Sequence, residues 1–298
     1  MANALHEYSS VTEAEPSLEN KQQADEFTHL ANINAYYDSQ AVQFFELLAE
    51  KQIHLGYWDD KYPNISLAQA AKRLTNVVID YLDVTQKSHL LDIGCGCGIP
   101  AIDIIQQKGC RVDGITLNFQ QQQKAKSLAR ETGLSAQANF IVGDANNLPY
   151  PPDYFNCALL LESIHHIGHH QAIAETWRVL KPGGSIVIAD GVALKENIPT
   201  KHAEWLAETF VAKSLLSEQQ IKLQLQEAGF SSLEMIDISQ AIQATWQKLV
   251  ELTKQNKAMI CKQHGLDFYK QVVAFWQQID EIWTASARYL IFKAYKEE

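Results

Sequence analysis

Cysteine is scarce in this sequence, and long apolar runs are absent. The 298 residues include only five cysteines, an odd number. A chain of this length can bury a core without disulfides, so a disulfide framework is not expected. No segment approaches the ~18 consecutive apolar residues of a membrane-spanning helix. The first residues also lack the cationic and apolar stretches of a secretory signal, so the sequence predicts a soluble, cytoplasmic protein.

Positive charge is in short supply as well. Lysine and arginine total 25 residues against 35 aspartates and glutamates, so the formal net charge is −10. Phosphate backbones and anionic lipids repel such a chain, which makes nucleic acid and acidic membrane surfaces poor partners. Apolar residues, by contrast, make up 46% of the chain. They are numerous enough to form a substantial core.

Short apolar runs alternate with helical patterns through the middle of the chain. A strand is expected where such a run is bounded by turn residues, and a helix where apolar residues recur every three or four positions. The strands predicted in this way span residues 90–93, 111–115, 139–142, 157–161, 185–189, 233–238 and 289–294. The alternation predicts an α/β fold built on a doubly wound parallel sheet.

Composition divides the chain into five parts. Residues 1–30 are polar and acidic and are predicted to be a flexible leader, and 31–86 carry helical patterns. Residues 87–191 hold the alternating core. Residues 192–285 are mostly helical with one core strand, and 286–298 contain the last strand and tail. The helical parts are expected to form a lid and cap, with helices over 27–52, 67–84, 205–216, 218–228, 242–261 and 268–283.

The most informative segment is a glycine turn between the first core strand and the next helix. Gly94, Gly96 and Gly98 alternate with other residues, and Asp92 stands two positions before the first glycine. Glycines are needed where the backbone takes positive φ or where a ligand approaches closely. A dinucleotide site has the spacing G-x-G-x-x-G, whereas the spacing here is G-x-G-x-G, which argues against a nicotinamide oxidoreductase. Asp92 suits a cationic amine better than a pyrophosphate; the remaining alternative is a turn without a ligand.

Together with later segments, this turn resembles that of the class I S-adenosylmethionine-dependent methyltransferases. The resemblance is to their small-molecule branch (methyltransferase type 11-like), which includes tocopherol, sterol and natural-product methyltransferases, and it covers about residues 34–296. Besides the turn, it is carried by residues 35–38, 54–59, 114–118, 142–145, 148–150, 162–167 and 178–184. It implies a Rossmann-like sheet of seven strands, S-adenosylmethionine as cofactor and a small-molecule acceptor.

The resemblance also implies roles for individual residues. Asp92 would hold the amino group of the cofactor's methionine part, and the three glycines would line the cofactor. Asp144 would accept a hydrogen bond from the adenine amine, with Ala145 beside the ring. Many methyltransferases bind the ribose with an acid at the end of the second strand. Thr116 stands at that place here, so the ribose is assigned to Thr116 and to Gln121 in the following helix.

A histidine-rich segment follows the fourth predicted strand and contains Glu162, His165 and His166. It should face the same crevice as the glycine turn. A histidine titrates near neutral pH and can accept the proton of a phenol or alcohol. The resemblance places the family's frequent histidine at His166, with His165 as the neighbouring alternative. A structural role for His166, with transfer driven by proximity alone, stays open.

The next two histidines raise the question of a metal site. His169 and His170 stand four positions after His165 and His166, a spacing that suits metal only on a continuous helix. Gly168 interrupts that helix, so no metal is expected. His169 and His170 are instead expected at the solvent-facing start of the next helix.

Aromatic residues are expected on both sides of the site. The resemblance places Tyr37 and Tyr57 over the cofactor, although ordinary core packing is an equal alternative. The cap contains four tryptophans, Trp205, Trp246, Trp276 and Trp283. An aromatic cap suits an apolar acceptor of natural-product, terpenoid or phenolic type. The expected function is methyl transfer to an oxygen or carbon of such an acceptor. The alternatives are a relative that cyclises or rearranges a natural product without methylating it, and a cofactor-binding regulatory protein.

Overall fold

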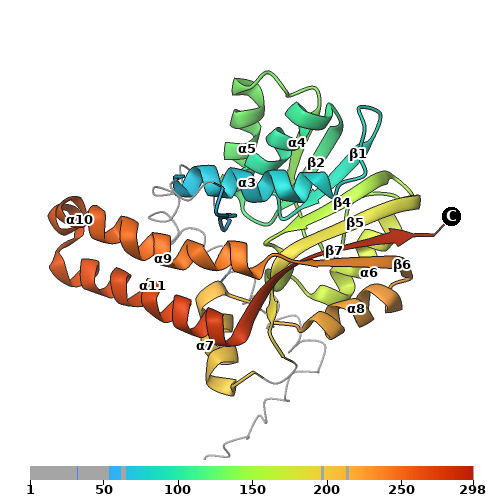
Figure 1. The fold of residues 1–298 in the computed structure, drawn as a ribbon. Helices are drawn as coiled ribbons and strands as arrows, with labels where there is room; N and C mark the ends of the chain where they lie inside the picture. Colours follow the sequence, from blue (N-terminus) through green and yellow to red (C-terminus); the bar gives the residue numbers. More distant parts are fainter. Residues whose placement is uncertain (1–31, 33–53, 62–64, 196–197, 213–214, 298) are drawn as a thin grey trace, which may run out of the picture.

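The computed structural model describes residue 32 and residues 54–61, 65–195, 198–212 and 215–297. The described residues form one seven-stranded sheet with the order β3-β2-β1-β4-β5-β7-β6 (Figure 1). The strands are β1 (His89–Ile93), β2 (Arg111–Thr116), β3 (Ala138–Val142), β4 (Phe155–Leu161), β5 (Leu180–Ala193), β6 (Phe230–Asp237) and β7 (Ala287–Lys296). All seven predicted strands are therefore confirmed.

The order of the strands creates a crevice. β1 pairs in parallel with both β2 and β4, and β2 and β4 pair in parallel with β3 and β5. The chain thus builds outward from β1 to β3 and then returns to β4 on the other side of β1. α/β sheets bind ligands at the carboxyl ends of the strands where this reversal occurs. Only β7 runs antiparallel to its neighbours in the described sheet.

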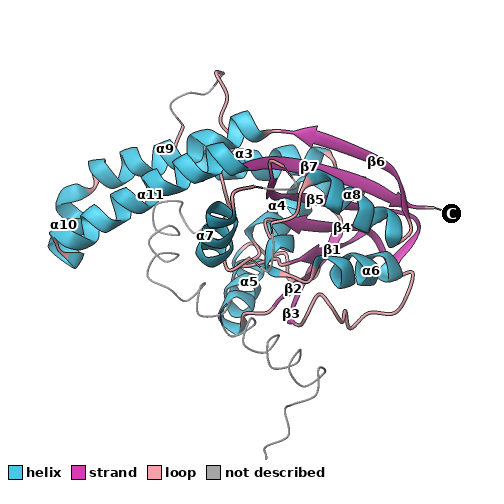
Figure 2. Ribbon diagram, turned by 90° about the horizontal axis from the view of Figure 1, so that it is seen from below, coloured by secondary structure: helices cyan, strands magenta, loops and turns pink. Residues whose placement is uncertain are grey.

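Helices cover both faces of the sheet (Figures 1 and 2). They are α3 (Leu67–Asp80), α4 (Ile99–Lys108), α5 (Phe119–Glu131), η1 (Ile164–His166), α6 (His169–Val179), α7 (Thr200–Phe210), α8 (Glu218–Glu227), α9 (Ser239–Gln255), α10 (Lys257–His264) and α11 (Leu266–Ser286). Successive strand residues point to opposite faces, so Leu90 packs in the core with α3, α4 and α5. Leu91 packs in the other core with α6 and α8.

The cap consists of α7 and a helical hairpin that extends beyond the sheet (Figure 1). α9 and α11 form the two arms of the hairpin, and α10 joins them. The predicted helix over 242–261 was wrong in its extent, because α9 ends before Asn256. The predicted helix over 205–216 also differs, since α7 ends at Phe210. Val211 has a φ of +48°, a left-handed conformation that cannot continue a helix.

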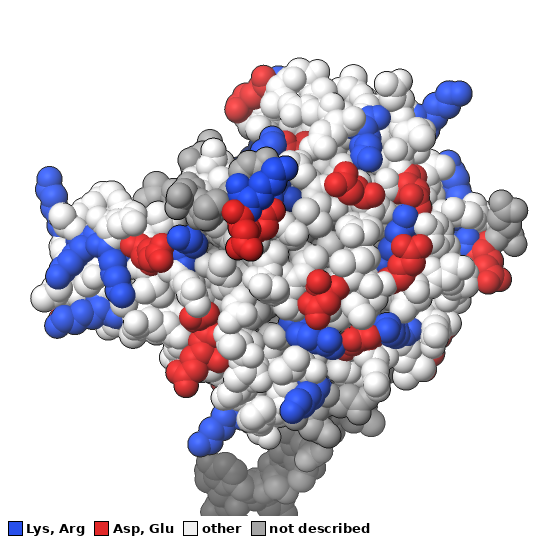
Figure 3. Space-filling model, viewed as in Figure 1, with Lys and Arg blue, Asp and Glu red and all other residues white. Residues whose placement is uncertain are grey.

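The distribution of charged side chains on the surface agrees with the negative net charge of the chain. On the face drawn in Figure 3, basic and acidic side chains are intermingled over the α/β body, and no extended basic area covers it. None of the helices within the described residues is long and apolar enough to cross a membrane.

Candidate functional site

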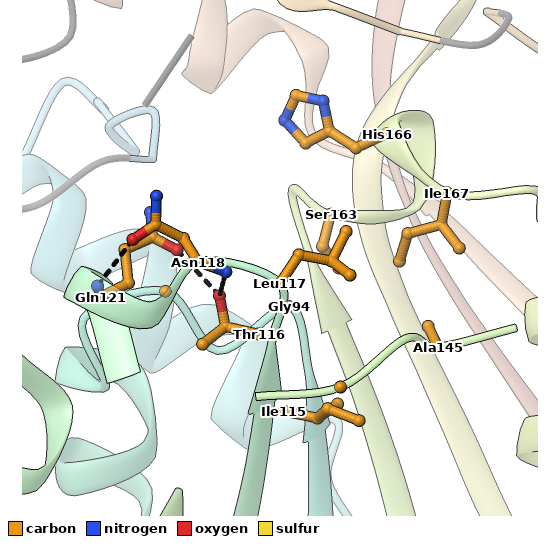
Figure 4. A pocket seen from close by; sticks show the side chains of 12 residues that line it. Gly94, Ile115, Thr116, Leu117, Asn118, Gln121, Ala145, Ser163, His166 and Ile167 are labelled. Atoms are coloured by element: carbon orange, nitrogen blue, oxygen red, sulfur yellow. Dashed lines mark hydrogen bonds between the residues drawn. The ribbon is translucent and has the colours of Figure 1, made fainter. Parts of the chain in front are cut away.

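A first cavity, called here the cofactor cavity, opens at the carboxyl ends of β1, β2 and β4 (Figure 4). Its floor is the glycine turn after β1, where Gly94 and Gly96 form part of the lining. One side is formed by the end of β2 and the start of α5. The other side includes Ala145, Ser163 and His166. The cavity therefore lies where the sequence predicted a nucleotide-like ligand.

The glycine turn requires its glycines. Gly94, Gly96 and Gly98 have φ values of 81°, 52° and 80°, which side chains rarely allow. A Cβ on Gly94 would lie 2.3 Å from the Cβ of Ser163, and one on Gly98 would lie 2.8 Å from the Cβ of Ala125. The turn is thus closely packed against the two sides of the cavity. Gly98 itself acts as the N-cap of α4 rather than as cavity wall.

Asp92 lies at the end of β1, two residues before this turn. It is only 2% exposed, and its Oδ2 atom has no hydrogen-bond partner among the described residues. Burial raises the pKa of its carboxyl to about 7. Buried polar atoms are almost always paired, so the free oxygen fits a ligand that brings an amine to the turn. S-adenosylmethionine carries such an amine.

Thr116 and Gln121 meet on the wall of the cofactor cavity. The Thr116 hydroxyl donates to Oε1 of Gln121 at 2.9 Å (Figure 4). Asn118 holds both in place, because its N–H donates to Thr116 Oγ1 at 3.3 Å and its Oδ1 accepts from Gln121 N–H at 2.9 Å. Asn118 is also the N-cap of α5. The structure thus brings the two predicted ribose residues together beside the cavity.

The loop after β3 contributes only one of its two predicted cofactor residues to the lining of the cofactor cavity. Ala145 lines it, but Asp144 does not. Asp144 Oδ1 instead accepts from the N–H and the side-chain amide of Asn146, at 2.9 and 3.1 Å. Tyr57 also lies elsewhere, on a hollow beside Trp58, where its backbone N–H bonds Ala70. Tyr37 is outside the described residues.

A second cavity, called here the cap cavity, lies between the ends of β4 and β5 and the cap helices. Its polar lining consists of Glu162, His165, Asp190 and Tyr289. Its apolar lining comes from the cap and the N-terminal segment and includes Leu55, Leu206, Phe210, Leu215, Trp246 and Trp283. Of the four tryptophans singled out in the sequence, two therefore face this cavity.

His165 and Asp190 form a pair in the wall of the cap cavity. Nδ1 of His165 lies 2.8 and 3.0 Å from the two carboxylate oxygens of Asp190. Asp190 also accepts hydrogen bonds from the N–H groups of Ile164 and Gly191, which fix the orientation of the carboxylate. Burial by itself lowers the pKa of His165, but the charge and hydrogen bond of Asp190 outweigh it. The net pKa lies above that of an ordinary histidine.

Glu162 connects three distant segments. Its carboxylate accepts from the N–H of Leu55 at 3.0 Å and from the hydroxyl of Tyr289 at 3.0 Å. Its φ of +48° is unusual for a residue with a side chain and is typical of functional sites. Burial, with a contribution from Asp190, raises the pKa of the Glu162 carboxyl. Glu162 thus joins the N-terminal segment and β7 to the site.

The two neighbouring histidines serve different cavities. His165 lines the cap cavity, whereas His166 lines the cofactor cavity. They are consecutive residues of the short helix η1, so their side chains diverge, although their ring centroids are only 4.0 Å apart. Nδ1 of His166 lies 3.3 Å from the carbonyl oxygen of Val211, just beyond α7. These two adjacent histidines therefore stand between the two cavities, and each lines one of them.

The other two histidines, His169 and His170, lie at the start of α6. No group of three or more potential metal ligands occurs among the residues that the structure describes. His169 and His170 begin α6, as predicted. Only His170 is exposed, however, and His169 is 7% exposed. The expectation that both face solvent was wrong for His169, which is buried.

Two residues of the cap cavity were missed from the sequence. Asp190 follows the apolar run of β5 at the same sheet edge as the glycine turn, and this position was a usable signal. Tyr289 gave no such signal, because only the antiparallel pairing of β5 with β7 brings it beside Glu162.

Comparison with known proteins identifies the family. The sequence matches the mycolic acid cyclopropane synthetase family over residues 24–289. The chain belongs to this family. One relative, (+)-O-methylkolavelool synthase from Herpetosiphon aurantiacus, is 28% identical over 268 residues, 90% of this chain and 94% of its own. Another, 27-O-demethylrifamycin SV methyltransferase from Amycolatopsis mediterranei, is 32% identical over 220 residues, 72% and 79% of the two chains.

Solved structures share the fold. The [4+2]-cyclase SpnF matches with a TM-score of 0.71 and 27% identity, covering 93% of this chain and 96% of its own. Geranyl diphosphate C-methyltransferase from Streptomyces coelicolor A3(2), solved with Mg²⁺, geranyl diphosphate and S-adenosyl-L-homocysteine, matches with a TM-score of 0.69 and 18% identity. That match covers 90% and 98% of the two chains; at this identity it shows the fold alone.

Family and relatives agree with the resemblance drawn from the sequence. The chain is a methyltransferase that uses S-adenosylmethionine. The glycine turn and the free oxygen of Asp92 fit that cofactor.

Proposed function

We propose that this enzyme transfers a methyl group to a hydroxyl oxygen of an apolar acceptor of natural-product, terpenoid or phenolic type, bound in the cap cavity. The observation that carries the proposal is His165 in the wall of that cavity, with Nδ1 held 2.8 Å from Asp190. The sequence left oxygen and carbon open as acceptor atoms. A carboxylate-held histidine favours oxygen, because an alcohol or phenol has a proton to lose.

His165 is assigned as the general base. Nδ1–H donates to Asp190, which leaves the lone pair of Nε2 to accept the proton of the acceptor hydroxyl. Asp190 then stabilises the imidazolium, as carboxylates do beside catalytic histidines. The apolar walls exclude water, which strengthens this interaction. The proton leaves Nε2 for solvent after the product departs.

The cofactor cavity is assigned to S-adenosylmethionine, which when bound supplies an electrophilic methyl group on its sulfonium sulfur. Asp92 would hold the methionine amine over the glycine turn. The Thr116 hydroxyl and the Gln121 amide would bind the ribose, and Asp144 with Ala145 would bind the adenine. The roles of Tyr37 and Tyr57 stay predictions.

Glu162 and His166 are assigned positioning roles. Glu162 already accepts hydrogen bonds from Leu55 and Tyr289, so it holds the N-terminal segment and β7 against the site. His166 lies on the cofactor cavity and on the end of α7. It would help place the cofactor beside the acceptor.

Two substitutions at neighbouring positions test the base. His165→Asn removes the proton acceptor, so we expect kcat to fall by about 10²–10⁴ while the affinity for S-adenosylmethionine is kept. His166→Asn is expected to raise the KM for S-adenosylmethionine and to lower kcat by less than about tenfold. The measurement is steady-state kinetics together with calorimetric titration of the cofactor.

His170→Asn is the control, because this exposed histidine lies on the outside of α6 and its loss should leave kcat unchanged. An unchanged kcat in His165→Asn would rule out His165 as the base. A collapse of kcat in His166→Asn alone would transfer the role to His166.

A second candidate is a cyclisation without methyl transfer. It is favoured by one observation, the match to SpnF at 27% identity over nearly the whole of both chains. Formation of S-adenosylhomocysteine separates the two candidates, since a cyclase forms none.

A further inference from the structure

The cap cavity holds a buried polar group without a partner that the proposed mechanism does not use. Trp246 on α9 lines the cavity and is 2% exposed. Its indole Nε1 has no hydrogen-bond partner within the described part of the chain. Its ring packs against the rings of Phe210 and Trp283, with centroid distances of 6.1 and 5.4 Å. Buried donors are almost always paired, so this N–H lacks an acceptor that a ligand in the cavity could supply.

The described ionisable side chains around the cap cavity are mainly acidic. Glu162 and Asp190 both contribute carboxyl groups to its wall, and no lysine or arginine is among the described residues that line it. A diphosphate placed here would face the Asp190 carboxylate, and His165, the one cationic side chain among the described lining residues, already pairs with Asp190. Like charges in a water-poor site are strongly unfavourable. The cavity therefore suits an uncharged molecule.

The reacting hydroxyl is a poor partner for Trp246. That oxygen must direct one lone pair at the methyl group while its proton goes to His165. A further donor on the same oxygen would withdraw electron density and weaken the nucleophile. The indole N–H is better matched to a different oxygen of the acceptor, such as an epoxide, ether, carbonyl or second hydroxyl.

We propose that the cap cavity selects uncharged acceptors that carry a second oxygen bound by Trp246, and that it rejects prenyl diphosphates. The proposal rests on the proposed function, because it concerns the same cavity. It distinguishes this chain from the geranyl diphosphate methyltransferase that shares its fold.

An outward shift of α7 would widen the cap cavity for the acceptor. The free space in the cap cavity is about 50 Å³, too little for a ten-carbon alcohol. α7 supplies Leu206 and Phe210 to the wall, and Leu206 is the one fully buried residue of that helix. An element with so few buried contacts opens at low free-energy cost, so its outward shift would admit the acceptor.

Three probes test the selection by equilibrium binding. Geraniol has one oxygen, 6,7-epoxygeraniol has two, and geranyl diphosphate is the anion. Each is titrated calorimetrically into the protein saturated with S-adenosylhomocysteine. We expect the epoxide to bind wild type about tenfold more tightly than geraniol, and geranyl diphosphate to bind at least about 100-fold more weakly.

Trp246→Phe should reduce the tenfold preference for the epoxide to about one, because it removes the N–H and keeps an aromatic ring. Trp177→Phe is the matched control: Trp177 also has an unpaired Nε1 but lies outside the cap cavity. If Trp246→Phe fails to fold, wild type can be compared on the epoxide and its isostere with CH₂ in place of oxygen. The isostere should bind like geraniol.

Three results would overturn the proposal. They are an epoxide preference that survives in Trp246→Phe, diphosphate binding equal to that of geraniol, and no binding of either uncharged probe. Because binding is measured without turnover, these results are independent of the proposed function. Probes that bind as expected but are never methylated would count against the proposed function alone.

Discussion

At the scale of single residues, the site depends on three buried carboxyl groups that differ in their hydrogen-bond partners. Asp92 has an oxygen without a partner, Glu162 is held by Leu55 and Tyr289, and Asp190 is held by His165 and two backbone N–H groups. The arrangement of Asp92 suits cofactor binding, that of Glu162 suits positioning, and that of Asp190 suits proton transfer. Each can be tested separately.

The ionised carboxylate of Asp92 should lower the free energy of unfolding of the cofactor-free protein. Its pKa is about 7 in the folded chain, against an ordinary 3.8. Between these values the folded state binds more protons than the unfolded state, so stability decreases as pH rises. Asp92→Asn removes this effect. We expect it to be more stable than wild type at pH 8, by on the order of 1–4 kcal/mol.

Urea unfolding of the two proteins measures the difference, which should shrink as the pH falls toward about 5. The same variant should lose most of its affinity for S-adenosylmethionine. An Asp92→Asn variant less stable than wild type at pH 8 would show that the carboxylate has a structural partner instead.

Methyl transfer should accelerate with pH. His165 must be neutral to accept a proton, and Asp190 holds its pKa above the ordinary 6.5. The rate should therefore rise through a midpoint above 6.5 and then level. Asp190→Asn removes the main group that raises this pKa, so the midpoint should move to lower pH while the plateau rate falls. Profiles of kcat/KM against pH for both proteins test this; an unmoved midpoint would mean that another group is titrating.

The sequence was sufficient to predict some of these site residues but not others. Asp92 and the glycines are a local pattern, so their spacing was sufficient. The choice between His165 and His166 was not decidable, because it depends on how a short 3₁₀ turn directs two consecutive side chains. Tyr289 is 127 positions from Glu162, and no local pattern reports such a contact.

At the scale of elements, the turn between β1 and α4 is the most constrained part of the cofactor cavity. Gly94→Ala would place a Cβ against Ser163 at a φ of +81°. We expect a loss of stability of more than about 2 kcal/mol and no measurable cofactor binding. Gly133→Ala is the control, since Gly133 has a φ of +72° but open space around its Cβ position.

That control should cost only the conformational term, about 1–2 kcal/mol, and should keep cofactor binding. Urea unfolding and cofactor titration of both variants give the comparison. Equal effects of the two substitutions would show that the contact with Ser163 is unimportant.

The elements themselves were predicted well where their patterns are local. The core strands were found because apolar runs alternate with helices, and α3 because Ala71, Leu74 and Ile79 recur at helical spacing. The ends of α7 and α9 were misplaced. Val211 and Asn256 end these helices through their backbone angles, which no composition signal predicts.

At the scale of the whole molecule, the reversal of strand order at β1 places the cofactor cavity and the cap cavity side by side. His166 and His165 face these two cavities from one turn. The sheet and the helical character of the cap were predictable from the sequence, whereas the tryptophans that line the cavity were not: Trp246 and Trp283 face it, but Trp205 packs against Phe275 instead. Which tryptophan lines a cavity is decided by helix packing, which sequence spacing does not specify.

The most direct test of the account follows the methyl group itself. The enzyme is incubated with S-adenosylmethionine carrying a CD₃ group and with a panel of apolar alcohols and phenols, and products are analysed by mass spectrometry. The account predicts CD₃ bound to oxygen in one acceptor class and an equal amount of S-adenosylhomocysteine. An acceptor converted without label and without S-adenosylhomocysteine would contradict it and would identify a cyclase.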